Sequence, residues 1–534
     1  MTRSGSASRS FRRFQRAARC LGIAFLSSCF ASAVPAEVVQ ITLYHTNDMH
    51  GWIMPREVPP SSPAPQGGMA VLSAYLERDT AGWSGRPEDK PYLLLDGGDF
   101  FQGTPEGNLT RGEAVVECMN RLGYDAAALG NHEFDFGVEA LSRLMGQARF
   151  PFLASNVRDG DGRLGALRPF LVKTVSGVNV GIFGLLTPET REMVVGKNIR
   201  GIEFEDERAA AQRCVRELRR RGAQVIVALT HCGWRGFSPE KGSGDAALAR
   251  SVKGVDVIIG GHSHTPFPDP QWVGDTMVVQ AGSRLGWVGK VRIDWDSASK
   301  KVSRMSYRLI PLRRDRWGEQ AEMKAFVAEQ RKKASAILGR DLDQVLGRAV
   351  TDITRNRSGE SLMGNWQTDV MRRRTGAQIA FQNSGGIRDD FRKGPLLVRD
   401  VYYVSPFENT LVTMMLTGRQ IRNILETSVS GRHGILQLSG MSMAYRPDSP
   451  VGQRVEEVVV GGYPLEESRA YQIVTNSFLA SGGDGFDDFE KGVNTVDTKI
   501  NLFDAECEAI RGASSVASRL EGRIRRIGEG EKAR

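Results

Sequence analysis

Short apolar runs alternate with helical stretches from residue 38 to residue 312, and this alternation limits the architectures open to the chain. A run that is apolar on both faces is typical of a strand buried between two other layers. Segments such as Glu113–Leu122 and Asp206–Arg221 have the spacing of intervening helices. The pattern therefore predicts a layered α/β domain. The runs expected to form its strands are Val38–Leu43, Tyr92–Leu95, Ala126–Leu129, Val180–Leu186, Val225–Leu229, Val255–Ile259 and Met277–Val279.

A second unit follows the first. Gln320–Leu338 is an uninterrupted helical pattern without Gly or Pro, which predicts a helix that connects two domains. After about Asp341 the strand and helix patterns resume. With 534 residues the chain is long enough to bury two separate cores. We expect a first α/β domain at 38–312, a linker helix within 313–340 and a second α/β domain at 341–527.

The first 36 residues resemble an export signal. An arginine-rich start precedes the apolar stretch Cys20–Val34, and Val34-Pro35-Ala36 offers a small-residue cleavage site. The stretch is shorter than the roughly 20 residues that a membrane-spanning helix needs. Leu26-Ser27-Ser28-Cys29 resembles a lipobox, so simple cleavage and a lipid anchor at Cys29 both stay open. We expect an exported protein, periplasmic or on the cell surface, without a transmembrane segment after the signal.

The charge balance argues against a nucleic-acid-binding protein. The formal net charge is +9, but six of the 71 Lys and Arg residues precede the first acidic residue, Glu37. Without residues 1–36, 65 basic and 62 acidic side chains remain, which lack the concentrated basic field of nucleic-acid-coating proteins. Four cysteines follow the signal, and their spacing does not choose among the three full disulfide pairings.

Polar clusters follow five of the apolar runs and hold five of the seven histidines. Because ligand sites in α/β sheets lie beyond the carboxyl ends of strands, these clusters predict one shared metal site. In an extended segment the spacing of Asp48 and His50 would direct both side chains to one metal. Glycines beside Asp99, Asn131 and His262 allow tight turns and positive φ. The clusters are Asn47–His50, Gly97–Asp99, Gly130–Asp135, Thr230–His231 and Gly260–His264.

These clusters also carry a resemblance to a known family. The strings HTNDMHG (45–51), GGDFFQG (97–103), GNHEFDFG (130–137), THCG (230–233) and GGHSHT (260–265) resemble the 5′-nucleotidase family, which belongs to the calcineurin-like metallophosphoesterases. The second unit is similar at Gly364-Asn365, NSGGIRDD (383–390), SPFENTLV (405–412) and TNSFLASGGDGF (475–486). The resemblance covers nearly the whole chain apart from the signal and about forty residues at the end.

The resemblance implies two divalent metal ions that activate a water for attack on phosphorus. A carboxylate shared by two cations offsets their repulsion, and a metal-bound water can ionise near neutral pH. The mixed ligands suit Zn, Mn, Fe or Co, so the metal identity stays open. By the resemblance, Asp48, His50 and His264 would hold the first metal, Asp99 would bridge, and Asn131, His231 and His262 would hold the second. His132 and Asp135 match the family's catalytic dyad.

The resemblance assigns substrate binding to the second unit. Guanidinium groups suit phosphate oxygens, and aromatic rings stack on nucleobases. The implied contacts are Arg357 and Arg388 for phosphate, Phe407 and Phe478 for a base held between two rings, Asp484 for the ribose, and Asn383 in the same motif as Arg388. The substrate would lie between the domains, and the family's domain rotation would pivot at Gln320–Leu338.

We therefore expect an exported, metal-dependent 5′-nucleotidase that converts nucleoside 5′-phosphates to nucleoside and phosphate. Relatives acting on 2′,3′-cyclic nucleotides, 3′-nucleotides or UDP-sugars share the metal motifs and stay as alternatives. A related thiosulfohydrolase typically lacks the pair that stands here as Asn131-His132. An inactive nucleotide-binding surface protein is the alternative from another class, although every implied ligand is intact.

Overall fold

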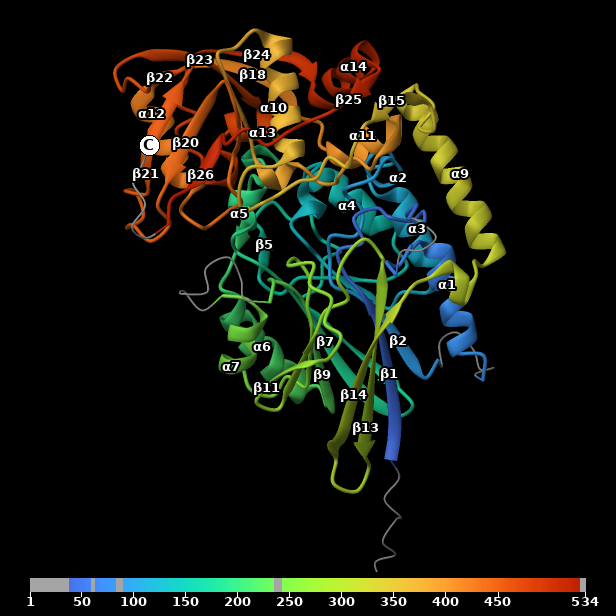
Figure 1. Ribbon diagram of the computed structural model, residues 1–534. Helices are drawn as coiled ribbons and strands as arrows, with labels where there is room; N and C mark the ends of the chain where they lie inside the picture. The colour runs from blue at the N-terminus through green and yellow to red at the C-terminus, as the bar shows by residue number, and fades with distance from the viewer. Residues whose placement is uncertain (1–37, 59–62, 83–89, 235–242, 529–534) are drawn as a thin grey trace, which may run out of the picture.

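The computed structural model describes residues 38–58, 63–82, 90–234 and 243–528, so the export signal expected at 1–36 lies outside the described residues. Two α/β bodies lie one above the other in Figure 1, with the N-terminal body below. Helix α9 (Ala321–Leu338) runs along one side of the molecule between them. The expected two-domain α/β architecture is confirmed.

The N-terminal domain contains two six-stranded sheets. The first has the order β14 (Lys301–Pro311), β13 (Trp287–Asp296), β1 (Val38–Thr46), β2 (Tyr92–Asp96), β3 (Ala126–Ala128) and β4 (Phe152–Leu153). The second has the order β11 (Gln271–Val273), β12 (Thr276–Val279), β10 (Val257–Ile259), β9 (Val225–His231), β7 (Val178–Leu186) and β6 (Phe170–Val175). A short pair, β5 (Val157–Asp159) and β8 (Ile202–Phe204), lies outside both sheets. Strands β1 to β4 are parallel neighbours, as are β7, β9, β10 and β12.

Alternate side chains of these strands enter different cores. In β9, Val225 and Val227 pack between the two sheets, whereas Ile226 packs against helices. This two-sided burial explains why the strands are apolar throughout. The first sheet is covered by α1 (Met69–Asp79), α3 (Glu113–Leu122) and α4 (Val138–Gln147), and the second by α6 (Glu207–Arg220) and α7 (Asp245–Ser251). The order of layers is helix, sheet, sheet, helix.

Helix α9 belongs to both cores. Its buried positions Met323, Val327, Gln330 and Ala334 recur every three or four residues and form one stripe. Met323 and Val327 pack in the N-terminal core, and Ala334 packs in the C-terminal core. Gly339 ends the helix in the left-handed conformation. The linker helix expected from the sequence is therefore confirmed and joins the two cores physically.

The C-terminal domain is built on a five-stranded sheet with the order β19 (Gln437–Ser439), β16 (Ile379–Gln382), β23 (Ala470–Asn476), β18 (Thr410–Thr417) and β24 (Val493–Asn501). One core contains α10 (Leu362–Thr375), α11 (Val398–Val404) and α14 (Leu502–Ala513). The other contains α12 (Gly418–Ser428), β20 (Met441–Tyr445) and β21 (Val455–Val460). Smaller sheets add β17 (Gly394–Leu397), β15 (Val345–Ala349) and β25 (Ser515–Val516), and β22 (Tyr463–Pro464) and β26 (Ile524–Arg526).

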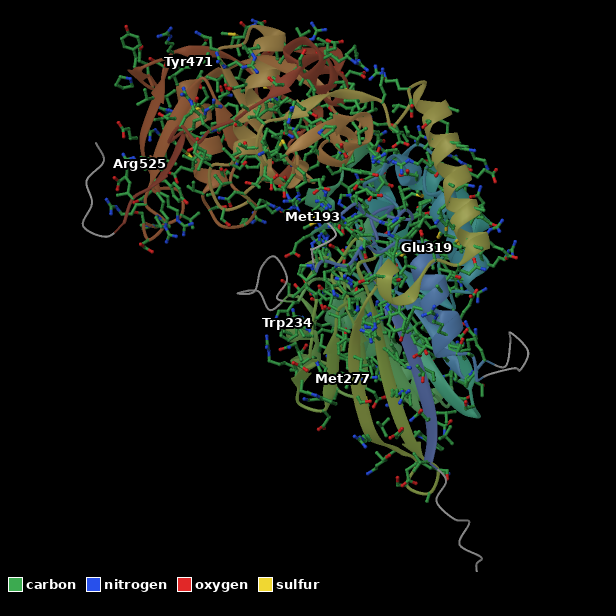
Figure 2. The ribbon with its side chains drawn as sticks, turned by 45° about the vertical axis from the view of Figure 1, so that its right-hand side comes forward. Met193, Trp234, Met277, Glu319, Tyr471 and Arg525 are labelled. Atoms are coloured by element: carbon green, nitrogen blue, oxygen red, sulfur yellow. The ribbon has the colours of Figure 1, made fainter. Side chains whose placement is uncertain are left out.

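Two short helices contribute to the contact between the domains. Helix α2 (Pro105–Asn108) contacts α11, and α5 (Thr190–Met193) contacts the 3₁₀ turn Gly483–Gly485. Of the other short helices, α8 (Arg314–Trp317) contacts α1, and α13 (Ser477–Ala480) contacts β18 and β23. Met193, at the end of α5, lies where the two domains meet in Figure 2. Cys118, Cys214, Cys232 and Cys507 are buried and unpaired within the described residues. No helix in the described ranges is long and apolar enough to span a bilayer.

Candidate metal centre and substrate cleft

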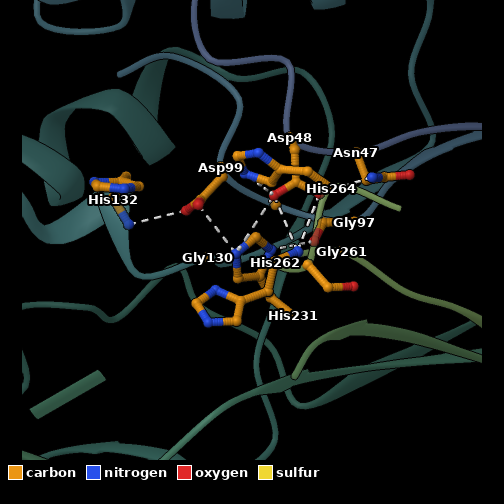
Figure 3. Close-up of polar contacts among 12 residues, drawn as sticks. Asn47, Asp48, Gly97, Asp99, Gly130, His132, His231, Gly261, His262 and His264 are labelled. Carbon is orange, nitrogen blue, oxygen red and sulfur yellow. Dashed lines mark hydrogen bonds and ion pairs between the residues drawn. The ribbon is translucent and has the colours of Figure 1, made fainter. Parts of the chain in front are cut away.

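Five strand ends deliver polar side chains to one place, but they come from both sheets of the N-terminal domain. Asp48 and His50 follow β1, Asp99 follows β2 and Asn131 follows β3, all in the first sheet. His231 is the last residue of β9, and His262 and His264 follow β10 in the second sheet. The side chains converge between the ends of the facing sheets (Figure 3).

Six of these side chains form two groups, each with one carboxylate and two imidazoles. The ligand atoms of each group lie within 4.8 Å of one another. The first group is Asp48, His50 and His264, and the second is Asp99, His231 and His262. Asp99 lies between the groups, because its Oδ2 is 3.1 Å from His231 Nε2 and 3.9 Å from His50 Nε2.

Backbone carbonyl groups orient two of the imidazoles. The Nδ1 atom of His50 lies 2.8 Å from the carbonyl oxygen of Gln102, and that of His231 lies 2.8 Å from the carbonyl oxygen of Gly97. These contacts direct Nε2 of each ring inward, as metal-binding histidines require. Asn131 Oδ1 is buried and accepts no hydrogen bond from the described residues. This donor set, nitrogen and oxygen with an unused amide oxygen, fits two divalent cations.

The backbone around the ligands differs from the sequence expectation. Asp48 and His50 have φ of 49° each, so they converge through left-handed turns and not along an extended segment. Asp99, His262 and His264 also have positive φ. Such conformations cost about 1–3 kcal/mol each and cluster at functional sites. The strained backbone conformation thus occurs at the candidate ligands themselves and not only at neighbouring glycines.

The glycines beside the ligands mainly provide space. A Cβ at Gly130 would lie 2.2 Å from Asp99 Oδ1, and one at Gly261 would lie 2.8 Å from His231 Nδ1. Gly98 alone among the glycines that directly precede Asp99, Asn131 and His262 has positive φ, at 91°. Positive φ, expected from the sequence, is thus present at Gly98. Gly130 and Gly261 do not have positive φ and are required instead for the close approach of neighbouring atoms.

Glu133 holds the loops that carry Asp99 and Asn131 together. Its buried carboxylate accepts hydrogen bonds from the N–H groups of Asp99 (2.9 Å), Phe100 (3.1 Å) and Gly130 (2.6 Å). The sequence interpretation assigned no role to Glu133, although it lies inside the cluster that contains Asn131 and His132. It is a structural support beneath the centre.

The pair His132 and Asp135 lies beside the two groups. His132 Nδ1 is 2.7 Å from Asp135 Oδ2, and the backbone N–H of His132 donates to Asp99 Oδ1 at 2.9 Å. Burial lowers the pKa of His132, but the charges of Asp135 and Asp99 outweigh it and raise the pKa above the ordinary value. Asp135 therefore orients the imidazole and favours its protonated form.

A cavity of about 1030 Å³ opens beside this centre and is lined by both domains. Asn131, His132 and Asp135 contribute to its wall from the N-terminal domain. All six side chains expected to bind substrate line the same cavity, namely Arg357, Asn383, Arg388, Phe407, Phe478 and Asp484. The structure thus brings the expected dyad and the expected substrate contacts together in one interdomain cleft.

Within the cleft, Arg388 lies beside the first group, with Nη2 3.4 Å from His50 Nε2. Burial and the charges of Arg357, Arg355 and Arg284 lower the pKa of Arg388 to about 9, which leaves the guanidinium protonated at neutral pH. This concentration of positive charge favours a bound anion.

The aromatic part of the cleft adjoins Arg388, whose guanidinium carbon lies 6.0 Å from the centroid of the Phe407 ring. Phe407 also lies 5.9 Å from the His132 ring, measured between centroids. Phe478 lines the same cavity. Asn383 donates to Asp484 Oδ2 at 2.9 Å, and Asp484 has φ of 57°.

Three cleft or interface residues were absent from the sequence interpretation. Asn198 donates to the Asp135 carbonyl at 2.6 Å, Asn108 donates to the Pro406 carbonyl at 2.6 Å, and Arg284 contacts Asp389 at 3.0 Å. Arg284 had a detectable signal, because it follows the expected strand Met277–Val279 as the ligand clusters follow theirs. Asn108 and Asn198 had none, because only folding brings them to their partners.

Comparisons with known proteins agree with this geometry. The family described as calcineurin-like phosphoesterase matches residues 41–266, and the 5′-nucleotidase C-terminal domain matches residues 341–491. A snake venom 5′-nucleotidase from Crotalus adamanteus is 30% identical over 512 residues, covering 86% of this chain and 84% of the relative. The solved structure of a 5′-nucleotidase precursor from Thermus thermophilus has 36% identity and a TM-score of 0.83, covering 92% of this chain and all of the other.

A sulfate thiohydrolase from Thermus thermophilus shares the fold, with a TM-score of 0.75 at 22% identity, covering 92% of this chain and 98% of the other. At that identity the likeness concerns the fold alone. The two matched regions fall within the two bodies described above, in the same order along the chain. The chain therefore belongs to the 5′-nucleotidase family of metallophosphoesterases.

Proposed function

We propose that this protein is a metal-dependent phosphatase that hydrolyses nucleoside 5′-phosphates to nucleoside and phosphate. The observation that carries the proposal is one cleft beside the two-group ligand cluster, in which a His–Asp pair, two arginines and two phenylalanines meet. Such a cleft offers guanidinium groups for a phosphoryl group and aromatic rings for a flat, hydrophobic base.

The ligand cluster would hold two divalent cations. When bound, they supply Lewis-acid polarisation of the phosphoryl group and acidify water near neutral pH. The residues that would hold them are Asp48, His50 and His264 on one side, Asn131, His231 and His262 on the other, and Asp99 between the two.

His132 would stabilise the negative charge that develops on the phosphoryl group or on the leaving oxygen. Asp135 fixes the ring through Nδ1, which leaves Nε2 to face the cleft as a donor. Arg357 and Arg388 would bind the phosphate oxygens with their planar guanidinium groups. The phosphate would then lie where positive charge is already concentrated.

The nucleoside would occupy the aromatic part of the cleft, next to Arg388. Phe407 and Phe478 would hold the base, and base–aromatic stacking contributes about 1–3 kcal/mol per base. Asp484, held by Asn383, would accept hydrogen bonds from the ribose. These contacts would favour nucleotides over simple phosphate esters by about one to two orders of magnitude.

We also propose that residues 1–36 direct export, either by cleavage or with a lipid anchor at Cys29. The protein would then release nucleosides outside the cytoplasm. Mass spectrometry of the mature N-terminus distinguishes a chain that begins near Glu37 from one that begins at a lipidated Cys29.

The direct test is phosphate release by metal-reconstituted protein lacking residues 1–36. The substrates are AMP, 3′-AMP, 2′,3′-cyclic AMP, ATP, UDP-glucose and p-nitrophenyl phosphate. We expect AMP to have a kcat/KM at least about tenfold above those of 3′-AMP and p-nitrophenyl phosphate. Preference for 3′-AMP or the cyclic nucleotide would overturn the substrate assignment, and bound nucleotide without hydrolysis would indicate a binding protein.

A further inference from the structure

Two N-terminal side chains reach across the domain interface and end beside different substrate contacts. One is Arg284, in the loop after β12, and the other is Asn108, the last residue of α2. Within the N-terminal domain, each residue makes a hydrogen bond to a loop that carries metal-facing residues. Each contacts the C-terminal domain next to a side chain that lines the cleft.

Arg284 links Asp48 to the segment of Arg388. Its backbone N–H donates to the Asp48 carbonyl at 2.7 Å. Its guanidinium lies 3.0 Å from Asp389 Oδ2 through Nη1, and Nη2 donates to the carbonyl oxygen of Arg388. Both partners are mostly buried, with side-chain exposures of 16% for Arg284 and 14% for Asp389. These contacts hold residues 388 and 389 and thereby fix the position of the Arg388 Cα, from which its side chain extends.

The surroundings of Arg284 restrict its movement. Its guanidinium lies over the Trp52 ring at 5.4 Å, and Trp52 packs against Tyr403 of the other domain, with ring centroids 4.5 Å apart. Arg56 also lies over Trp52 but is 3.9 Å from Asp389, at the limit of an ion pair. Arg284 therefore makes the short contact to Asp389, and Arg56 makes a weaker one.

Asn108 links the loop after β2 to the segment of Phe407. Its Oδ1 accepts the Gly103 N–H at 2.8 Å, and its Nδ2 donates to the Pro406 carbonyl at 2.6 Å. Gly103 directly follows Gln102, whose carbonyl orients His50. Although Asn108 lines the cleft, it is buried and both polar atoms of its amide are engaged by protein.

We propose that Arg284 and Asn108 are positioning residues that set two neighbouring substrate contacts separately. Arg284 places Arg388 for the phosphate, and Asn108 places Phe407 for the base. This inference rests on the proposed function, because it assigns the phosphate to Arg388 and the base to Phe407. Neither residue acts on substrate directly. Each transmits the position of the metal-facing loops to one substrate contact in the other domain.

The test measures the two halves of the substrate separately. The affinities of inorganic phosphate and of adenosine are determined by calorimetry on the metal-reconstituted protein, which requires no turnover. Arg284→Met should weaken phosphate binding about tenfold and change adenosine binding less than twofold. Asn108→Leu keeps the size of the side chain, adds no charge to the anion-binding cleft and loses the donor to Pro406. It should weaken adenosine binding about tenfold and leave phosphate binding within twofold.

Matched variants separate positioning from a general loss of structure. Arg56→Met should have a smaller effect on phosphate than Arg284→Met, because Arg56 does not reach the Arg388 carbonyl. Arg158→Met, which removes an exposed ion pair to Glu205 in the N-terminal domain, should change neither affinity. The double variant Asp389→Asn, Arg284→Met should weaken phosphate binding by less than the product of the two single fold-changes, because both substitutions remove the same ion pair.

The outcomes distinguish the inference from the function on which it rests. If each variant weakens both ligands equally, or neither, the separate positioning roles are wrong. If the unaltered protein binds neither phosphate nor adenosine, or does not hydrolyse AMP, the proposed function fails first. Unfolding curves of each variant identify any that fail to fold. If the variant at position 284 or 108 fails to fold, Arg284→Lys or Asn108→Ala takes its place, and its affinities for phosphate and adenosine are measured in the same way.

Discussion

The candidate metal centre and the expected substrate contacts differ in how they are held. The residues of the metal centre lie at strand ends, are mostly buried, and have positive φ at five of the seven expected ligands. Glu133 and two backbone carbonyls fix their loops and rings. The expected substrate contacts lie on loops and short helical turns of the C-terminal domain, and Phe407 and Phe478 are half-buried. The expected metal ligands are thus placed by buried backbone and the expected substrate contacts by a few side chains, so changes in the two regions should have different kinetic signatures.

The largest effect should follow Asp99→Asn. The change removes the carboxylate charge between the two ligand groups and should lower kcat for AMP on the order of 1000-fold. Steady-state kinetics and metal analysis would check this together, with loss of at least one bound metal expected. The exposed Asp161→Asn serves as control. Full activity with two bound metals would contradict the bridging position.

His132→Ala should lower kcat by at least about 100-fold, the usual scale for a positioned proton-transfer or charge-stabilising group. The bound metal should be unchanged, because His132 is outside both ligand groups. Asp135→Asn should have a smaller effect, since the amide oxygen can still accept from Nδ1 and the change removes only the charge that favours the protonated imidazole. Near-normal turnover of the His132 variant would refute its role.

A change behind an aromatic ring should affect KM instead of kcat. A Cβ at Gly483 would lie 2.5 Å from the Phe478 ring, so Gly483→Ala should displace the ring and raise KM for AMP about tenfold. Turnover of p-nitrophenyl phosphate, which has no base, should stay the same. Gly512→Ala in α14 has open space around it and is the control. Equal effects on both substrates would argue against Phe478 as a base contact.

The smallest effect concerns a buried carboxyl behind the Phe407 loop. Glu506 accepts hydrogen bonds from Gln367 at 2.5 Å and Ser405 at 3.0 Å, and burial raises its pKa to about 8. The folded protein thus keeps a proton that the unfolded chain releases near pH 4.5. The contribution of Glu506 to the free energy of unfolding is fully present below pH 4.5 and is lost as the pH rises from 4.5 to about 8.

Glu506→Gln should therefore flatten the fall in the free energy of unfolding between pH 5 and 8. Urea unfolding at several pH values compares the variant with the unaltered protein. Glu133 has a similarly raised pKa, so only the difference between the two proteins is informative. Parallel pH profiles would show that Glu506 is already ionised in the folded state.

The sequence predicted a large part of this architecture because its signals are local. Two-sided burial makes a run apolar throughout, and this identified β1, β2, β7 and β9 to within a few residues. The helix from Gln320 to Leu338 was evident from its spacing and became α9. The expected ligands were visible as polar residues directly after apolar runs, since a strand end can face a site whatever the remaining chain does.

Tertiary structure alone decided what depends on distant segments. The sequence did not show that the ligands come from the ends of two facing sheets, because pairing between strands far apart leaves no local pattern. Neither did it show the left-handed turns at Asp48 and His50, the support from Glu133, or the links of Asn108 and Arg284. Residue types and spacing determined which groups this protein brings to its site, and packing of the two domains determined how they face each other.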